Sequence, residues 1–240
     1  MNSNSEMTFL EHFSELRTRI FKMFLSIALF AIIGYIYSNQ LIEFLIQPID
    51  DPDIKLQVLK ITSIFSTKLM VSFFTGFLLS VPVIIYQALF FIKPAFSEKI
   101  TIRKIYMYIL LSLFLCVIGI LFGYYILIPA SIGFFKNISF DLINSININL
   151  TLDGYLTYFI WILILSSFVY QLPIFILILV KTGMVDILWL QSNRRYAIVL
   201  FFIFGALLSP PDPISQIFVA LPLIFLYELS ILLSKIFHNE

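Results

Sequence analysis

Five long stretches of this chain contain no charged residue. They are residues 23–42, 69–92, 105–135, 154–180 and 196–211. A sixth stretch, 213–234, is interrupted only at Glu228. A helix needs about 20 apolar residues to cross a hydrocarbon core of about 30 Å, so the first four stretches suffice alone and the last two qualify as a pair. Lipid leaves the edge of an open sheet without hydrogen-bond partners, so the spans must be helices.

The sequence therefore predicts an all-α, polytopic membrane protein with a single domain over residues 1–240. Hydrophobic residues make up 60% of the chain and charged residues 12%, whereas soluble domains have about 45–50% and about 25%. The spans are expected at residues 23–42, 69–92, 105–128, 155–180, 196–211 and 213–234.

The basic residues gather on one side of the membrane. With six crossings, eleven of the fifteen fall on the side of the N-terminus. These are Arg17, Arg19, Lys22, Lys93, Lys99, Arg103, Lys104, Lys181, Arg194, Arg195 and Lys235. Loops rich in Lys and Arg stay on the side of synthesis, so both termini are expected on that near side. The loops at 43–68 and 129–153 then face the far side, where they could cover the mouth of a concave bundle.

Residues 1–22 form the near-side segment before the first span. Phe13, Leu16 and Ile20 recur at helical spacing, which predicts a short helix lying in the membrane interface. Thr8 and Glu11 fit a capping box, so this helix is expected to begin there. The alternative is a plain anchor with one solvated face.

The last two spans are expected to be short. The sixteen residues between Arg195 and Asp212 would make a helix of about 24 Å, less than the hydrocarbon core. The hairpin that follows is rigid, because Pro210, Pro211 and Pro213 fix φ and remove backbone donors. Short spans at one edge of a helical bundle would thin the bilayer there, which would suit a protein that moves something bulky across the membrane.

No pattern of residues indicates an enzyme. The two histidines, His12 and His238, lie near opposite ends of the chain, and no zinc-protease, nucleophile-elbow or nucleotide-binding motif occurs. The spans contain no pair of carboxylates. We therefore predict a protein that is not an enzyme, with no cofactor, no metal and no nucleic-acid partner.

Polar side chains inside the spans are costly in lipid and are usually functional. Gln171 lies beside Pro173, a helix-kinking residue, and both a functional role and an interhelical hydrogen bond alone remain open. Glu228 is explained by snorkelling towards the near side. Gln87 and Gln216 are expected to be packing contacts between helices.

Acidic residues are scarce on the near side. A ligand with two adjacent guanidinium groups would need fixed carboxylates there. Glu15 is held by its helix next to the bilayer, and Glu98 lies in the loop between the second and third spans. The alternative for each is an ordinary solvated surface residue.

Three motifs in this order resemble the TatC family, the multispanning receptor of the twin-arginine protein translocase. They are His-Phe-Ser-Glu-Leu-Arg-Thr-Arg at 12–19, Tyr-Gln-Ala-Leu-Phe-Phe-Ile-Lys-Pro-Ala-Phe at 86–96 and Leu-Ser-Pro-Pro-Asp-Pro-Ile-Ser-Gln at 208–216. The resemblance runs from about residue 9 to 237 and matches the expected topology. It implies a cup-shaped bundle of six transmembrane helices with both termini on the near side.

The resemblance also implies a function and partners. A TatC-like protein binds the twin-arginine signal peptides of folded cargo. It assembles, as a homo-oligomer within a receptor complex, with single-span subunits of the TatA and TatB types, and the proton-motive force drives export. The positions that match the signal-peptide site are Glu15, Leu16, Arg17, Phe91 and Pro94, with Glu98 as the nearest acid in the loop. The positions that match the far side and the partner-docking edge are Pro48, Ser209, Asp212 and Gln216.

Two positions depart from the family pattern. The family usually has a glutamate six residues after Pro94, where this chain has Ile100, and Glu98 is the acid that could replace it. The fourth span usually has a glutamate where this chain has Gln171. An amide keeps the hydrogen bonding at membrane depth but cannot change charge.

A different class of protein, a secondary transporter or channel for a small solute, is the alternative function. It is disfavoured because the spans show no midplane charged pair and no obvious repeated halves. The location is expected to be a bacterial cytoplasmic membrane, a thylakoid or a mitochondrial inner membrane. The richness in Ile, Phe, Asn and Tyr mildly favours an organelle.

Overall fold

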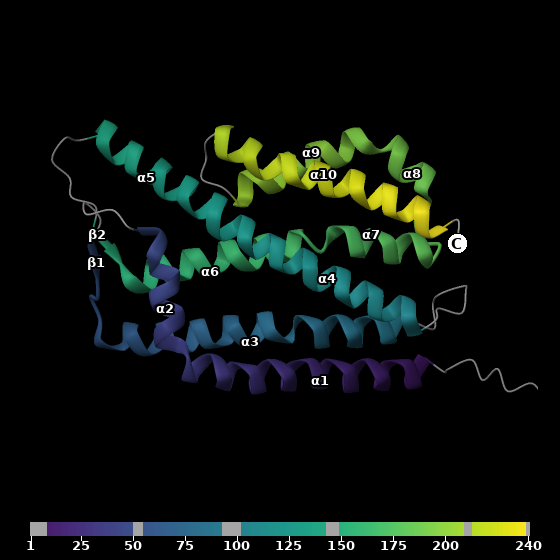
Figure 1. The fold of residues 1–240 in the computed structure, drawn as a ribbon, viewed down its shortest axis with the longest axis horizontal. Helices are drawn as coiled ribbons and strands as arrows, with labels where there is room; N and C mark the ends of the chain where they lie inside the picture. Colours follow the sequence, from purple (N-terminus) through teal and green to yellow (C-terminus); the bar gives the residue numbers. More distant parts are fainter. Residues whose placement is uncertain (1–8, 50–54, 93–101, 143–148, 209–212, 239–240) are drawn as a thin grey trace, which may run out of the picture.

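The structure is a computed structural model that describes residues 9–49, 55–92, 102–142, 149–208 and 213–238. Its long helices lie roughly alongside one another (Figure 1). The first helix, α1 (Phe9–Ile36), begins at the same end of the molecule at which the last helix, α10 (Pro213–His238), finishes. We call this the near end and the opposite end the far end. The shared end fits an even number of crossings, while the orientation in the membrane stays a prediction.

The described residues form six long helical segments, some of which contain a break or a change of helix type. In chain order they are α1; α3 (Ile61–Ile92); α4 (Ile102–Phe122) continued by a π-helical turn, η3 (Gly123–Leu127), and α5 (Ile128–Leu142); α6 (Leu152–Val169) continued by α7 (Leu172–Lys181); α9 (Arg194–Leu208), preceded by the short α8 (Ile187–Ser192); and α10. Five helices in the described part of the chain are long and apolar enough to cross a membrane. The predicted helical membrane fold is confirmed, whereas the cup shape stays a prediction.

The first span differs from the prediction at both ends. Residues 9–22 do not form a separate interfacial helix, because α1 runs unbroken from Phe9 to Ile36. The predicted cap at Thr8 lies outside the described residues. The span was also predicted to reach Ile42, but the chain turns at Tyr37 into α2 (Ser38–Ile46), which lies across the long helices (Figure 1). A charge-free stretch bounds the length of apolar chain and does not show where its direction changes.

The later spans also correct the prediction. α9 is short, at 15 residues or about 22 Å. α10 has 26 residues and is not short, so the prediction of two short spans is correct only for α9. The third span was predicted to end at residue 128, but η3 and α5 extend the helix to Leu142. In the fourth span the helix breaks after Val169, and Pro173 stands in the first turn of α7, which confirms the predicted kink.

The far end contains a small sheet that the sequence did not predict. β1 (Lys55–Gln57) pairs in parallel with β2 (Asn149–Thr151) and joins the two far-side loops. Two hydrogen bonds reach α2 from its neighbours: the hydroxyl of Tyr124 donates to the carbonyl of Phe44 at 2.8 Å, and that of Tyr155 donates to the carbonyl of Leu45 at 3.2 Å. These bonds fix α2 against η3 and α6.

α3 and α4 both pack against α6. Its side chains Leu156, Phe159 and Leu163 are almost completely buried. α1 lies at the edge of the bundle and packs chiefly against α3. The two backbones approach closely at Gly76, where a Cβ atom would lie only 2.7 Å from the backbone nitrogen of Ala31. Much of the rest of α1 is exposed and apolar, as a lipid-facing helix requires.

Candidate functional site

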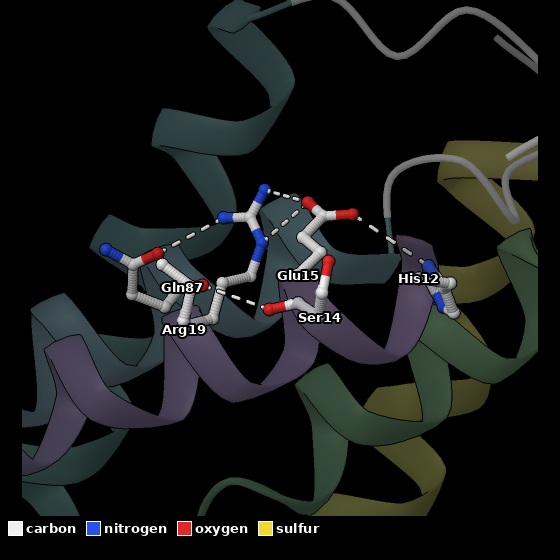
Figure 2. A network of polar contacts seen from close by, with 6 residues as sticks. His12, Ser14, Glu15, Arg19 and Gln87 are labelled. Carbon is white, nitrogen blue, oxygen red and sulfur yellow. Dashed lines mark hydrogen bonds and ion pairs between the residues drawn. The ribbon is translucent and has the colours of Figure 1, made fainter. Parts of the chain in front are cut away.

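A polar cluster lies at the near end, on the face of α1 that meets α3. His12, Glu15 and Arg19 are three and four residues apart, so one face of the helix carries all three. Figure 2 shows Arg19 between Glu15 and Gln87, with His12 on the other side of Glu15. Gln87 comes from the last turns of α3. The cluster therefore joins the beginning of α1 to the end of α3.

Arg19 makes polar bonds on two sides. Its Nε donates to Glu15 Oε1 at 2.8 Å, and its Nη2 donates to the same oxygen. Its Nη1 donates to Oε1 of Gln87 at 3.1 Å (Figure 2). The guanidinium carbon also lies 5.9 Å from the ring centre of Phe90, within range of a cation–π interaction. Arg19 is thus held by both helices.

The second oxygen of Glu15 is left over from this arrangement. Glu15 Oε2 is buried and accepts no hydrogen bond from any residue that the structure describes. Its nearest recorded partner is His12, whose Nδ1 lies 3.8 Å away. The His12 ring stacks on Phe91, with ring centres 4.4 Å apart and planes 17° from parallel. An acceptor oxygen and a flat aromatic pair therefore stand side by side.

The structure brings only some of the predicted near-side residues together. Glu15 and Phe91 are brought together through His12. Leu16 is half-buried, but Arg17 is exposed and lies on another face of α1 from Glu15. Pro94, Glu98 and Ile100 lie outside the described residues.

The predicted far-side residues are only partly described. Gln216 donates from Nε2 to the carbonyl of Phe202 at 2.9 Å, which ties α10 to α9. Pro48 lies in η1 (Gln47–Ile49), a 3-10 turn after α2. Ser209 and Asp212 lie outside the described residues.

Gln171 makes a closed pair with Ser112 of α4. Its Nε2 donates to the carbonyl of Ser112 at 3.1 Å, and its Oε1 accepts from the hydroxyl of Ser112. Both ends of the amide are used, so the interhelical hydrogen bond that the sequence left open is present. Glu228 pairs with Arg194 at 2.9 Å, and both side chains are partly exposed.

The sequence missed three members of the near-end cluster, His12, Arg19 and Gln87. The spacing of His12, Glu15 and Arg19 could have shown that they share a helix face. Nothing local could have joined Gln87 to them, because that contact spans 68 residues of chain.

The sequence profile of the family described as Sec-independent protein translocase protein (TatC) matches residues 11–222. The chain belongs to the TatC family. It is 33% identical over 235 residues to TatC of Desulforapulum autotrophicum, covering 97% of this chain and 86% of the relative. It is 32% identical over 232 residues to TatCy of Bacillus subtilis, covering 96% and 90%.

The fold agrees with that of a solved TatC. The crystal structure of the twin arginine translocase receptor TatC in DDM superposes with a TM-score of 0.81 at 30% identity, covering 93% of this chain and 99% of the other. TatC membership makes the chain an integral, multi-pass membrane protein with a role in twin-arginine translocation, and not an enzyme. The resemblance noted in the sequence is confirmed, and the solute-transporter alternative is set aside.

Proposed function

We propose that this TatC-family chain is the receptor subunit that binds the twin-arginine signal peptides of folded cargo. Binding takes place at the near end of α1 and α3. The chain then assembles, as more than one copy, with single-span subunits of the TatA and TatB types, and the proton-motive force drives export.

The observation that carries this proposal is the oxygen of Glu15 that accepts no hydrogen bond from the described residues. A buried carboxylate oxygen without a hydrogen bond is costly, so a donor that reaches it is bound favourably. A guanidinium group offers several N–H donors and a full positive charge. The half-buried Leu16 and the ring of Phe91 supply apolar surface beside it for the hydrophobic part of a signal.

The remaining predicted positions complete the proposed site. Arg17 is solvent-exposed, so it would meet the peptide only at the rim. Pro94 and Glu98 follow α3 by a few residues, so they are close in sequence to Phe91. Glu98 would take the second arginine.

The short α9 supports the proposed docking edge. A helix of about 22 Å is shorter than the hydrocarbon core, so the bilayer thins beside it or flanking groups snorkel. Gln216 ties α9 to α10 at this edge. We assign the edge, with Pro48, Ser209 and Asp212 on the far side, to contacts with the partner subunits and with further copies of the chain.

Site-specific photo-crosslinking tests the receptor assignment. A photoreactive residue replaces Phe91, and native membranes are exposed to a twin-arginine signal peptide or to its twin-lysine counterpart. We expect adducts that depend on the twin arginine and that fall sharply in the Glu15→Gln variant. Asp186→Asn is the matched control, because it removes an exposed near-end charge outside the cluster. Adducts of equal yield with both peptides, or unchanged by Glu15→Gln, would refute the assignment.

A further inference from the structure

The two oxygens of Glu15 have different surroundings because of how Arg19 approaches. In the usual paired geometry, two guanidinium nitrogens meet two different carboxylate oxygens. Here Nε and Nη2 of Arg19 both donate to Oε1. One oxygen is therefore committed within the chain, and Oε2 stays outside the pair.

Gln87 explains why Arg19 sits to one side of the carboxylate. Its Oε1 accepts a hydrogen bond from Nη1, the guanidinium nitrogen that does not bond to Glu15, at 3.1 Å. Gln87 is 9% exposed and belongs to α3, so it is a fixed point against which Arg19 is aligned. Gln87 makes no contact with Glu15 that the structure records, so any influence on the carboxylate passes through Arg19.

We infer that Arg19 and Gln87 are positioning residues that hold one oxygen of Glu15 and leave only the other, which neighbouring side chains cover in this structure, to accept from a ligand cation. This inference rests on the proposed receptor function. A bound guanidinium would then direct its N–H donors to Oε2 alone, beside the His12–Phe91 stack. Two donors can share that oxygen, because a carboxylate oxygen has two lone pairs.

A double-mutant cycle tests the inference. The affinity of a fluorescent twin-arginine signal peptide is measured for the full chain in nanodiscs, for Gln87→Leu, for Glu15→Gln and for the double variant. Loss of one aligning hydrogen bond is expected to weaken binding about fivefold in Gln87→Leu. In the Glu15→Gln background, the same Gln87→Leu change is expected to alter the affinity by less than about twofold, since no carboxylate remains to be aligned.

Two further variants separate positioning from general damage. Ser166→Ala also removes a hydrogen bond between two helices, the one from the Ser166 hydroxyl to the carbonyl of Gly119 in α4. It lies outside both proposed sites, so it is expected to leave peptide affinity unchanged. Arg19→Lys keeps the charge but loses the planar fork that reaches both Glu15 and Gln87, so it is expected to weaken binding about as much as Gln87→Leu.

The outcomes distinguish the inference from the proposal beneath it. If Glu15→Gln alone leaves the affinity unchanged, the proposed signal-peptide site is wrong and the inference fails with it. If Glu15→Gln weakens binding but Gln87→Leu costs the same factor in both backgrounds, the receptor proposal stands. In that case Gln87 has only a structural role, and the inference is overturned.

Discussion

Replacing Gly76 by alanine tests a close contact between α1 and α3. The added methyl group would lie 2.7 Å from both the nitrogen of Ala31 and the carbonyl oxygen of Ile27, whereas ordinary contact begins at 3.4 Å. Both neighbours are backbone atoms, so α1 must move away by about 0.7 Å, the difference of these distances. A gap of this size forfeits roughly a quarter to a half of the contact energy. We expect a cost of about 2 kcal/mol from the clash.

Gly133→Ala is the matched control for this change. No neighbouring heavy atom lies within 4 Å of a Cβ placed at Gly133, as far as the structure describes the chain. Alanine improves helix propensity by about 1 kcal/mol at either position, so that gain cancels in the comparison and the clash alone remains.

The chain carries its own reporter of unfolding. Cys116 is the single cysteine and is 5% exposed, so a thiol-reactive dye labels it when the bundle opens in detergent. A difference of about 2 kcal/mol predicts that Gly76→Ala unfolds about 4–8 °C below Gly133→Ala. Equal unfolding temperatures for the two variants would refute the close approach of α1 and α3 at Gly76.

Three further variants probe contacts elsewhere in the bundle. Gln171→Leu is expected to lose about 1 kcal/mol of stability, since it breaks the pair with Ser112; a complete loss of cargo export at normal protein level and melting temperature would instead reveal a functional role. Tyr124→Phe is expected to lose about 1 kcal/mol by freeing a carbonyl of α2, and faster proteolysis at the far end would report it. Glu228→Gln is expected to change the melting temperature very little, because the ion pair with Arg194 is 40–48% exposed and so worth less than about 1 kcal/mol.

Much of the fold could be predicted because the bilayer imposes simple lengths. The charge-free stretches predicted where the long helical segments lie. The small number of residues between Arg195 and Asp212 predicted the short α9. The turn at Tyr37 could not be located, since the residues on both sides of it are apolar enough to continue a span. The parallel pair of residues 55–57 with 149–151 was also missed, because it joins two loops more than ninety residues apart.

The candidate site shows the same division between local and distant signals. Glu15 could be chosen from the scarcity of near-side acids and from its motif. The alignment of the Glu15 carboxylate could not be predicted, because Arg19 is held by Gln87, which lies on a different helix. The sequence assigned Gln87 to packing between helices, and in the structure it also accepts a hydrogen bond from Arg19.

The contact between α1 and α3 links the stability of the bundle to the candidate site. The Arg19–Gln87 bond and the His12–Phe91 stack both cross it. Because α1 packs chiefly against α3, little else in the described structure resists a displacement of α1. A shift of about 0.7 Å would stretch the 3.1 Å bond to about 3.8 Å, beyond the usual limit for a hydrogen bond. We therefore expect Gly76→Ala to weaken signal-peptide binding although it alters no residue of the cluster. A Gly76→Ala protein that melts early yet binds the peptide with full affinity would show that the cluster keeps its geometry without a tight helix contact.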